Sequence, residues 1–334
     1  MRSPWTKISP LEGGPNLGSR PIIAETSWGG SAVWSRSKIN MSSNPFPFVS
    51  VIVPVFNGGV GISKTIETLI VQSYPREHFE IIVVDNGSED QTRIVIKNFP
   101  VILLEQPLRG SYAARNIGIA HAKGDILAFT DSDCIPDKNW ISNGVNFMRS
   151  HNAKAIGGFV KFIFSNIPSP AEYTDALISI DNENSIIAHG MAATANLFVK
   201  KETLQHIGIF NQKLQSGGDG EWSARAKKSG ITMMFAKDAV VYHPARNFNE
   251  LIKKHIRIGS GSVAVWSARG KNKLWKFAAT IHLFTPIFAF KIPALVRKKF
   301  PQNQIYPIGR MICIAYLCKI ATGFGIIKSL LRGK

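Results

Sequence analysis

The sequence has few cysteines and, over its last quarter, no acidic residues. Its 334 residues include three cysteines, and no two of them form a C-x-x-C pair. This excludes a disulfide framework and a cysteine-rich zinc module, and it favours a reducing compartment. Residues 251–334 contain 16 lysines or arginines and no aspartate or glutamate. Such a cationic segment indicates an anionic partner, which is either a nucleic acid or a membrane surface.

The rest of the chain carries little net charge. The formal charge is +18, but residues 49–250 contain 19 basic and 20 acidic residues. Residues 1–47 are rich in Gly, Pro, Ser and Trp, show neither helical nor strand periodicity, and lack the apolar segment of a secretory signal. We expect them to form a disordered N-terminal extension.

From residue 48 onward, predicted strands alternate with predicted helices. Four short apolar runs have the composition of buried parallel strands: 49–55, 79–84, 101–104 and 126–129. Apolar residues with helical spacing lie between the first two runs, from Ile62 to Ile70, and residues 113–122 predict another helix. This order predicts an α/β fold with an open, mostly parallel sheet flanked by helices. Such sheets bind ligands beyond the carboxyl ends of their strands.

Polar clusters lie at these predicted strand ends. Pro54 to Asn57 close the first strand, Asp85 the second, and Asp131 and Asp133 the fourth. A lone carboxylate such as Asp85 can accept hydrogen bonds from a base imide or from ribose hydroxyls. Two carboxylates at i and i+2 point to the same side of a strand end, so both can reach a divalent cation or a ligand that it holds.

Three more clusters follow along the chain. Asp219 and Glu221 come after two glycines at a predicted helix start, where the helix dipole favours a carboxylate. His243 ends a predicted strand. The segment from His255 to Gly261 is basic and rich in glycine, a composition suited to closing over phosphates.

The order of these segments resembles the family 2 inverting glycosyltransferases of the GT-A fold. Five motifs carry the resemblance: VSVIVPVFN, EIIVVDNGSED, GSYAARNIGIAHAKGDILAFTDSD, GGDGEWSARAKKSG and AVVYHPAR. Together they are more specific than any one of them. The resemblance implies a GT-A domain at 48–265 and leaves 266–334 as a basic, apolar helical tail.

The resemblance also implies roles for the donor site, whose substrate would be a nucleotide-diphospho-sugar. In such enzymes the carboxylate at the position of Asp85 holds the nucleobase, and the one at Asp131 contacts the ribose or the water shell of the metal. Arg257 matches a basic group on a mobile loop over the phosphates. The full set of expected donor-binding residues is Pro54, Val55, Asn57, Asp85, Arg115, Asn116, Asp131 and Arg257.

The expected cofactor is Mg²⁺ or Mn²⁺. By the resemblance, Asp133 ligates a cation that bridges the donor diphosphate, and His243 approaches the metal or the diphosphate. Asp219 matches the general base, with Glu221 as the alternative. A carboxylate that removes the proton of an attacking hydroxyl contributes roughly 10² to 10⁴ in rate. Attack opposite to the leaving group inverts the anomeric centre, and the sequence has no Ser-His-Asp or Cys-His signature for a covalent intermediate.

Two departures from the commonest family pattern refine this interpretation. Gly218 stands where many members have Glu before the base, and the processive Q-x-x-R-W signature is absent. We therefore expect a single-addition transferase that acts on a glycan or lipid-linked acceptor in cell-surface polysaccharide or glycolipid assembly.

Three other functions have less support. A dehydrogenase fingerprint is suggested by Gly59 and Gly61, with Asp85 24 residues after Gly61, but Lys64 stands at the third glycine position. A sugar-nucleotide pyrophosphorylase would need a glycine-rich phosphate loop with a catalytic lysine, which is missing. A non-enzymatic protein that binds membranes or nucleic acid rests on charge alone.

Long apolar runs interrupt the basic tail: 277–290, which continues after Lys291 over 292–296, and 311–327, which is broken only by Lys319. Each is near the lower limit of about 17 to 20 residues for a membrane span. Both ends of each run are basic, whereas a spanning helix has basic residues mainly on its cytoplasmic side. We therefore expect helices that lie in, or dip into, the cytoplasmic face of the cell membrane, with anionic lipid rather than nucleic acid as the partner. A buried soluble subdomain is the alternative.

Overall fold

The computed structural model describes residues 46–107, 109–268 and 291–331, together with Asn272, Thr280, Ile281 and Leu283. The described residues belong to one compact unit. The expected disordered extension lies outside the described residues, apart from its last two positions. Most of the first apolar run, at 277–290, also lies outside them.

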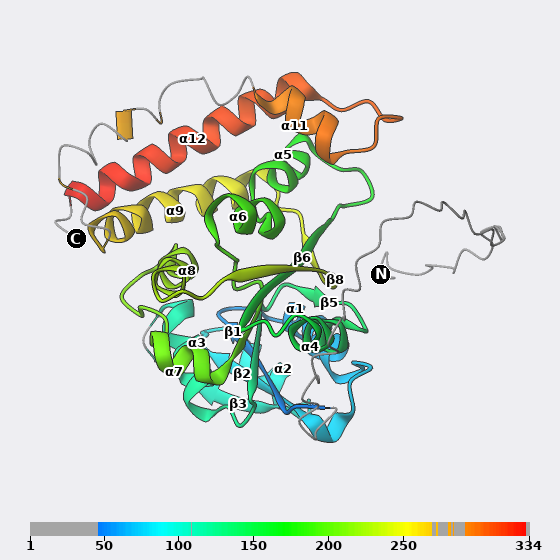
Figure 1. Ribbon diagram of the computed structural model, residues 1–334. Coiled ribbons are helices and arrows are strands. Elements are labelled where there is room, and N and C mark those ends of the chain that lie inside the picture. The colour runs from blue at the N-terminus through cyan, green and yellow to red at the C-terminus, as the bar shows by residue number, and fades with distance from the viewer. Residues whose placement is uncertain are drawn as a thin grey trace, which may run out of the picture. The chain divides into compact units, whose positions relative to one another are not determined.

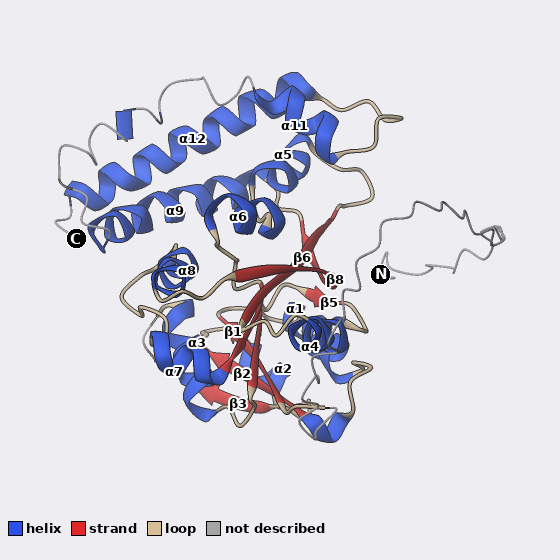
Figure 2. Ribbon diagram, viewed as in Figure 1, coloured by secondary structure: helices blue, strands red, loops and turns tan. Residues whose placement is uncertain are grey.

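In the described part of the chain, eight strands form one mixed sheet in the order β3-β2-β1-β4-β7-β6-β8-β5 (Figures 1 and 2). Their bounds are β1 Val49–Val55, β2 Phe79–Asp85, β3 Ile102–Glu105, β4 Ile126–Thr130, β5 Ile135–Pro136, β6 Ala155–Ile163, β7 Asn196–Lys200 and β8 Met233–Pro244. The strands β1 to β4 pair in parallel, as the sequence predicts. The second half is mixed, because β7 runs antiparallel to β4 and β6, and β5 runs antiparallel to β8.

Helices cover both faces of the sheet (Figure 2). Their bounds are α1 Gly61–Ile70, α2 Thr92–Ile96, α3 Ser111–His121, α4 Trp140–Ser150, α5 Pro170–Ile178, α6 Asn182–His189, α7 Lys201–Ile207, α8 Gly218–Lys228, α9 Phe248–Ala268, α11 Ile292–Lys299 and α12 Ile308–Leu331, with a short 3₁₀ turn at Arg76–His78. Side chains alternate along β1, so Val51 and Val53 pack with α1 and α4, while Ile52 packs with α3 and α8. Every residue of β1 is buried, as expected of a strand covered on both faces.

The helices α9 and α12 lie side by side, and α12 also contacts α5 and α11 (Figure 1). Two glycines permit this close approach. A Cβ atom at Gly259 would lie 2.0 Å from the carbonyl oxygen of Thr322, and one at Gly325 would lie 2.1 Å from that of Ile256. The glycine-rich segment expected to form a mobile loop is therefore part of a helix, and its glycines serve helix packing.

The helix α12 is also long and apolar enough to cross a membrane. It has 24 residues, its most apolar window has a mean hydropathy of 1.6, and 39% of that window is buried inside the protein. Length and composition of this kind fit a core helix as well as a membrane-associated one. The second apolar run of the sequence thus forms a single helix that packs partly against α9.

Candidate active site

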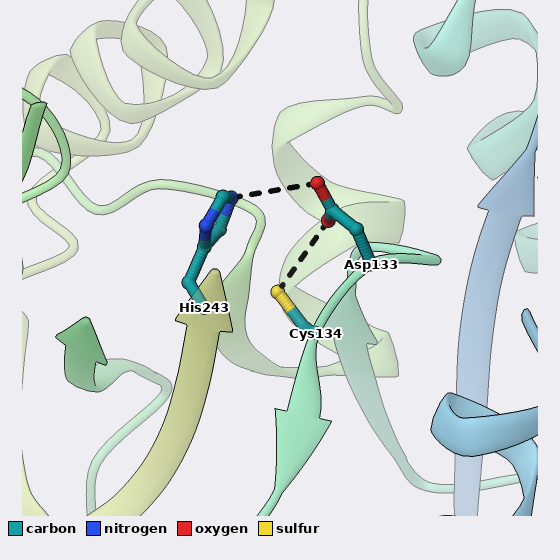
Figure 3. Close-up of side chains that lie close together, drawn as sticks. All are labelled: Asp133, Cys134 and His243. Carbon is teal, nitrogen blue, oxygen red and sulfur yellow. Dashed lines mark hydrogen bonds and ion pairs between the residues drawn. The ribbon is translucent and has the colours of Figure 1, made fainter. Parts of the chain in front are cut away.

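Asp133 and His243 face each other across the carboxyl ends of β4 and β8 (Figure 3). The Nδ1 atom of His243 donates to the carbonyl oxygen of Pro244 at 2.7 Å, because a carbonyl can only accept. In the neutral ring the lone pair therefore lies on Nε2, which is 3.7 Å from the Asp133 Oδ2. The imidazole is buried, whereas the Asp133 side chain is 52% exposed.

These two side chains fit a divalent cation. A carboxylate oxygen suits Mg²⁺ or Mn²⁺, and a neutral imidazole nitrogen favours the transition metal of the two, Mn²⁺. Cys134 lies in the same cluster, but burial, followed by the charges of Asp133 and Asp131, raises the pKa of its thiol well above the usual value. The Cys134 side chain is fully buried in the core with α1 and α4, and its soft sulfur suits Mg²⁺ or Mn²⁺ less than a carboxylate oxygen does.

The other aspartate of the pair, Asp131, is held by a buried arginine. The Nη2 atom of Arg115 lies 2.5 Å from the Asp131 Oδ1, and the arginine side chain is only 4% exposed. Within the described residues, the buried Nε of Arg115 has no hydrogen-bond partner. Arg115 thus fixes the direction of the Asp131 carboxylate. Its neighbour Asn116 uses both ends of its amide on the backbone of Phe210, at 2.8 and 3.1 Å, so it supports the fold around α3 instead of facing the strand ends.

The expected nucleoside pocket lies at the ends of β1 and β2. Asp85 is buried, and its carboxylate accepts from the backbone amide of Ser88. Pro54 and Val55 are buried and pair in register with Val84 and Asp85. The exposed Asn57, at a φ of 48°, accepts from the backbone amide of Glu89 at 3.0 Å. Two loops that are far apart in sequence are therefore joined around Asp85.

Asp219 lies in the first turn of α8, where the helix dipole favours its charge. Its Oδ1 accepts from the hydroxyl of Tyr112 at 3.3 Å and from the backbone amide of Gly220 at 2.9 Å. Burial, with the nearby Asp219 charge, raises the pKa of Tyr112, so the phenol remains a donor. A Cβ at Gly218 would lie 2.7 Å from the Tyr112 ring, which explains why glycine replaces the usual acid.

A small cavity of about 170 Å³ opens beside this carboxylate. It lies between α8 and α9, and its lining residues are Met191, Ser216, Gly217, Asp219, Gly220, Ile258, Ser262, Val265 and Trp266. The alternative base, Glu221, is engaged in an ion pair with Arg225 at 2.7 Å. Of the two acids in this turn, Asp219 is therefore the one that faces the cavity.

Comparison with known proteins identifies the family. The model described as "Glycosyl transferase family 2" matches residues 50–201. The glycosyltransferase AglE of Haloferax volcanii is 35% identical over 301 residues, which cover 87% of this chain and 99% of AglE. This chain belongs to glycosyl transferase family 2. The predicted family is confirmed, and with it a glycosyltransferase in place of the dehydrogenase, pyrophosphorylase and non-enzymatic alternatives.

Two more distant relatives also span most of this family 2 enzyme. A Methanococcus voltae transferase is 24% identical and covers 86% of this chain and 98% of its own; its name gives a dolichyl N-acetylglucosaminyl phosphate as the molecule it modifies. The mannosyltransferase PcManGT of Pyrobaculum calidifontis, solved with GDP-Man and Mn²⁺, has a TM-score of 0.59 at 21% identity, over 86% of this chain and 88% of its own. The PcManGT likeness confirms the GT-A fold.

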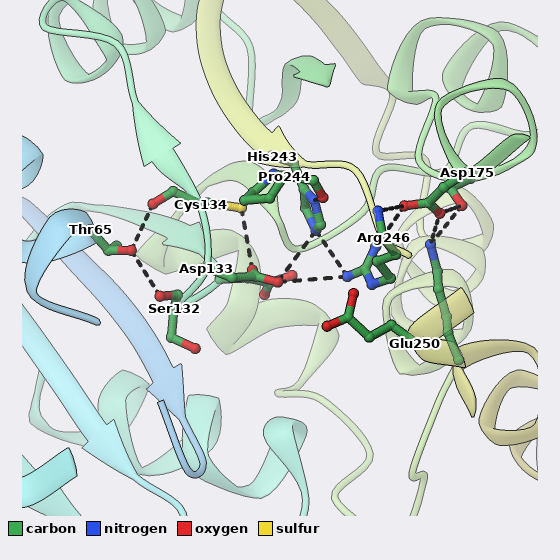
Figure 4. A network of polar contacts seen from close by, with 12 residues as sticks. Thr65, Ser132, Asp133, Cys134, Asp175, His243, Pro244, Arg246 and Glu250 are labelled. Atoms are coloured by element: carbon green, nitrogen blue, oxygen red, sulfur yellow. Dashed lines mark hydrogen bonds and ion pairs between the residues drawn. The ribbon is translucent and has the colours of Figure 1, made fainter. Parts of the chain in front are cut away.

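Sequence reasoning missed one part of this family 2 site, a network that reaches from Asp133 into α5 (Figure 4). Arg246 lies 3.7 Å from the Asp133 Oδ2 and 3.0 Å from the His243 Nε2. Its other side contacts Asp175, which is fully buried and also binds Lys254 at 3.1 Å. Arg246 is part of the AVVYHPAR motif, so its place three residues after His243 was an available signal. Asp175 gave no signal of this kind, because nothing in the sequence of α5 distinguishes it from a helix without a functional role.

Two charged groups of the network have displaced pKa values. Burial alone would raise the pKa of Asp175, but the charges of Lys254 and Arg246 and the hydrogen bonds to the carboxyl lower it by more. The net pKa is below the usual value, so the carboxyl stays charged. Burial lowers the pKa of Lys254 to about 8, in spite of Asp175. The expected phosphate-loop residue Arg257 is exposed on α9, where its charge also acts on Lys254. Arg257 therefore lies on a packed helix and not on a loop.

Proposed function

We propose that this glycosyltransferase moves a sugar from a nucleotide-diphosphate donor to an acceptor hydroxyl, with inversion and in single additions. The carrying observation is the position of Asp219 at the cavity between α8 and α9. Both of its hydrogen bonds within the described residues use Oδ1. The second oxygen, Oδ2, is then available to take the proton of an acceptor hydroxyl in the cavity.

The reaction is a single displacement. The acceptor oxygen forms a bond to the anomeric carbon while the bond from that carbon to the diphosphate breaks, and the hydroxyl proton passes to Asp219. Tyr112 and the Gly220 amide hold the carboxylate in one orientation. This lowers the entropic cost of bringing the carboxylate and the acceptor hydroxyl into a reactive geometry. One carboxylate in the cavity is sufficient for this chemistry, and no enzyme nucleophile is required.

The donor site is proposed at the strand ends beside this cavity. Asp85, buried between the joined loops, holds the base or ribose, and Asp131, which pairs with Arg115 of α3, directly follows the end of β4. Asp133 and His243 would hold Mg²⁺ or Mn²⁺; the carboxylate oxygen fits either ion, and the imidazole nitrogen favours Mn²⁺. When bound there, such an ion neutralises charge on the leaving diphosphate.

The proposed acceptor is a lipid-linked glycan presented at the cytoplasmic face of the membrane. The Methanococcus voltae relative, whose name specifies a dolichyl-linked sugar, supports this class of acceptor. Apolar side chains on α12 are exposed, among them Leu317, Phe324 and Leu331. Residues 251–334 contain only basic charges, which favours an anionic lipid surface. We accordingly propose 48–265 as the catalytic domain and 266–334 as a membrane-associating tail.

A donor panel tests the proposal. The full-length protein is incubated with UDP-, GDP- and dTDP-sugars, a dolichyl-phosphate-linked sugar and either Mg²⁺, Mn²⁺ or EDTA. We expect release of one nucleoside diphosphate that depends on acceptor and on metal, and a product whose anomeric configuration, read by NMR coupling, is opposite to that of the donor. A retained configuration would contradict the displacement, and turnover in EDTA would contradict the metal role.

A further inference from the structure

Arg246 contacts the two side chains that fit a divalent cation. Its Nη2 atom lies 3.0 Å from the His243 Nε2 and 3.7 Å from the Asp133 Oδ2 (Figure 4). We propose that Arg246 competes with the divalent cation for His243 and Asp133, so that the enzyme binds the cation tightly only together with a nucleoside diphosphate. The inference rests on the proposed metal role of these two residues.

The competition follows from the single lone pair of the imidazole. The Nδ1 hydrogen of His243 is used on the Pro244 carbonyl, so Nε2 is the one ring nitrogen that can accept a hydrogen bond or bind a cation. An N–H group of Arg246 occupies that lone pair in the contact at 3.0 Å. A cation on Nε2 therefore requires the guanidinium to move away, and the two positive charges also repel each other.

Arg246 is held in place from its other side. Its backbone amide donates to the Asp175 Oδ2 at 3.0 Å, and its Nη1 lies 3.4 Å from the same oxygen. Asp175 is fully buried and has a second cation, Lys254, on its other oxygen. Because the backbone contact does not involve the guanidinium, the side chain can turn from His243 while the chain itself stays anchored.

A diphosphate changes the balance between the two cations. It supplies oxygen acceptors both for the displaced guanidinium and for the metal, so each positive charge gains a partner. Nucleotide and metal then favour each other's binding, and by linkage the enhancement must be equal in both directions. In the absence of nucleotide, Arg246 keeps the affinity for free metal low.

The test measures Mn²⁺ binding to the full-length protein by the EPR signal of free Mn²⁺, alone and with GDP or UDP, after correction for Mn²⁺–nucleotide complexes in solution. Two variants remove the contact. Arg246→Gln also removes the charge, whereas Arg246→Lys keeps it on a shorter side chain that does not span from Asp175 to His243. Lys254→Met is the matched control, because it removes one positive charge from the same network but leaves the Nε2 contact in place.

We expect both Arg246 variants to bind Mn²⁺ alone about tenfold more tightly than the wild type, and to lose most of the enhancement by nucleotide. Lys254→Met should change Mn²⁺ affinity by less than about twofold. Equal changes in Arg246→Gln and Lys254→Met, with none in Arg246→Lys, would assign the effect to net charge and overturn the inference. Weaker binding in the Arg246 variants would also overturn it. A wild type that binds no Mn²⁺ with any nucleotide would refute the proposed metal role as well.

Discussion

Asp219 gains its orientation from a neighbour on a different helix. The Tyr112 hydroxyl donates to one carboxylate oxygen, and the tyrosine ring packs against the α8 backbone at Gly218. Because burial keeps the phenol protonated, Tyr112 acts as a fixed donor and not as an acid or base. At the scale of single residues, the proposed site consists of the Asp219 carboxylate and the contacts that fix its orientation.

Asp219→Asn should abolish transfer while keeping the donor site intact. The amide has nearly the shape of the carboxylate but does not take a proton, so we expect kcat to fall by roughly 10² to 10⁴. Donor affinity, measured by calorimetry, should stay within about twofold. Glu221→Gln is the matched control variant, two residues further along α8. It should retain activity, since Glu221 is paired with Arg225. An active Asp219→Asn variant together with an inactive Glu221→Gln variant would contradict the assignment of Asp219 as the general base.

Gly218→Ala should destabilise the protein, because its Cβ would meet the Tyr112 ring at 2.7 Å. Overpacking of this kind costs about 1–3 kcal/mol in the free energy of unfolding, to be measured by denaturant titration. Gly220→Ala, two residues further along the same helix, meets only the flexible end of Met191 at 3.4 Å. It should be neutral or slightly stabilising, and equal losses in the two variants would contradict the packing account.

Among the elements, the parallel strands were predictable and the antiparallel insertion was not. Short runs rich in β-branched residues, such as 49–55, favour buried strands, and their alternation with helices predicts parallel pairing. The strand β6 contains Gly157 and Gly158, which weaken a strand pattern. A Cβ at Gly158 would lie 2.3 Å from the Ala239 carbonyl, so this glycine reflects a tertiary contact that no local pattern records.

The same distinction applies to the site. Carboxylates at strand ends follow from local sequence, and the structure brings Asp131 together with Arg115 and Asp133 with His243. The link from Arg246 to Asp175 joins residues 71 positions apart on different elements, and only the fold defines it. The segment from His255 to Gly261 was misinterpreted as a loop, because glycine in a packed helix and glycine in a turn look alike in sequence.

Gly325→Val should disrupt the contact between α12 and α9. The added side chain would collide with the Ile256 carbonyl, 2.1 Å from the position of its Cβ, and force the helices apart. We expect about 1–3 kcal/mol of destabilisation and faster amide hydrogen exchange in α12. Gly309→Ala is the control on the same helix, because its Cβ position has no atom within 4 Å among the described residues, apart from its chain neighbours and the nearby backbone of α12. Unchanged exchange in Gly325→Val would contradict the close approach.

At the scale of the molecule, the basic residues are concentrated in the same segment of the sequence as the exposed apolar side chains of α12. Residues 251–334 combine 16 basic residues with the exposed side chains of Leu317, Phe324 and Leu331. Lysines and arginines near an anionic membrane contribute about 1 kcal/mol each, and inserted apolar side chains add to this. Residues 49–250, with 19 basic and 20 acidic residues, have no comparable excess of positive charge.

The triple variant Leu317→Ser, Phe324→Ser and Leu331→Ser should release the protein from anionic vesicles in a sedimentation assay. A triple serine variant of Val71, Ile94 and Ile187, which are also exposed but lie outside α12, should still bind. Binding should weaken with added salt, because the basic residues supply part of the attraction. Equal binding by both triple variants would contradict a membrane role for α12.

The helix α9 belongs to both halves of the molecule at once. Ile258, Ser262 and Val265 line the cavity beside Asp219, while Gly259 of the same helix is packed against α12. The two halves therefore do not behave as exchangeable modules. A chimera that takes its tail from another transferase must take α9 as well, and with it the side chains that line this cavity.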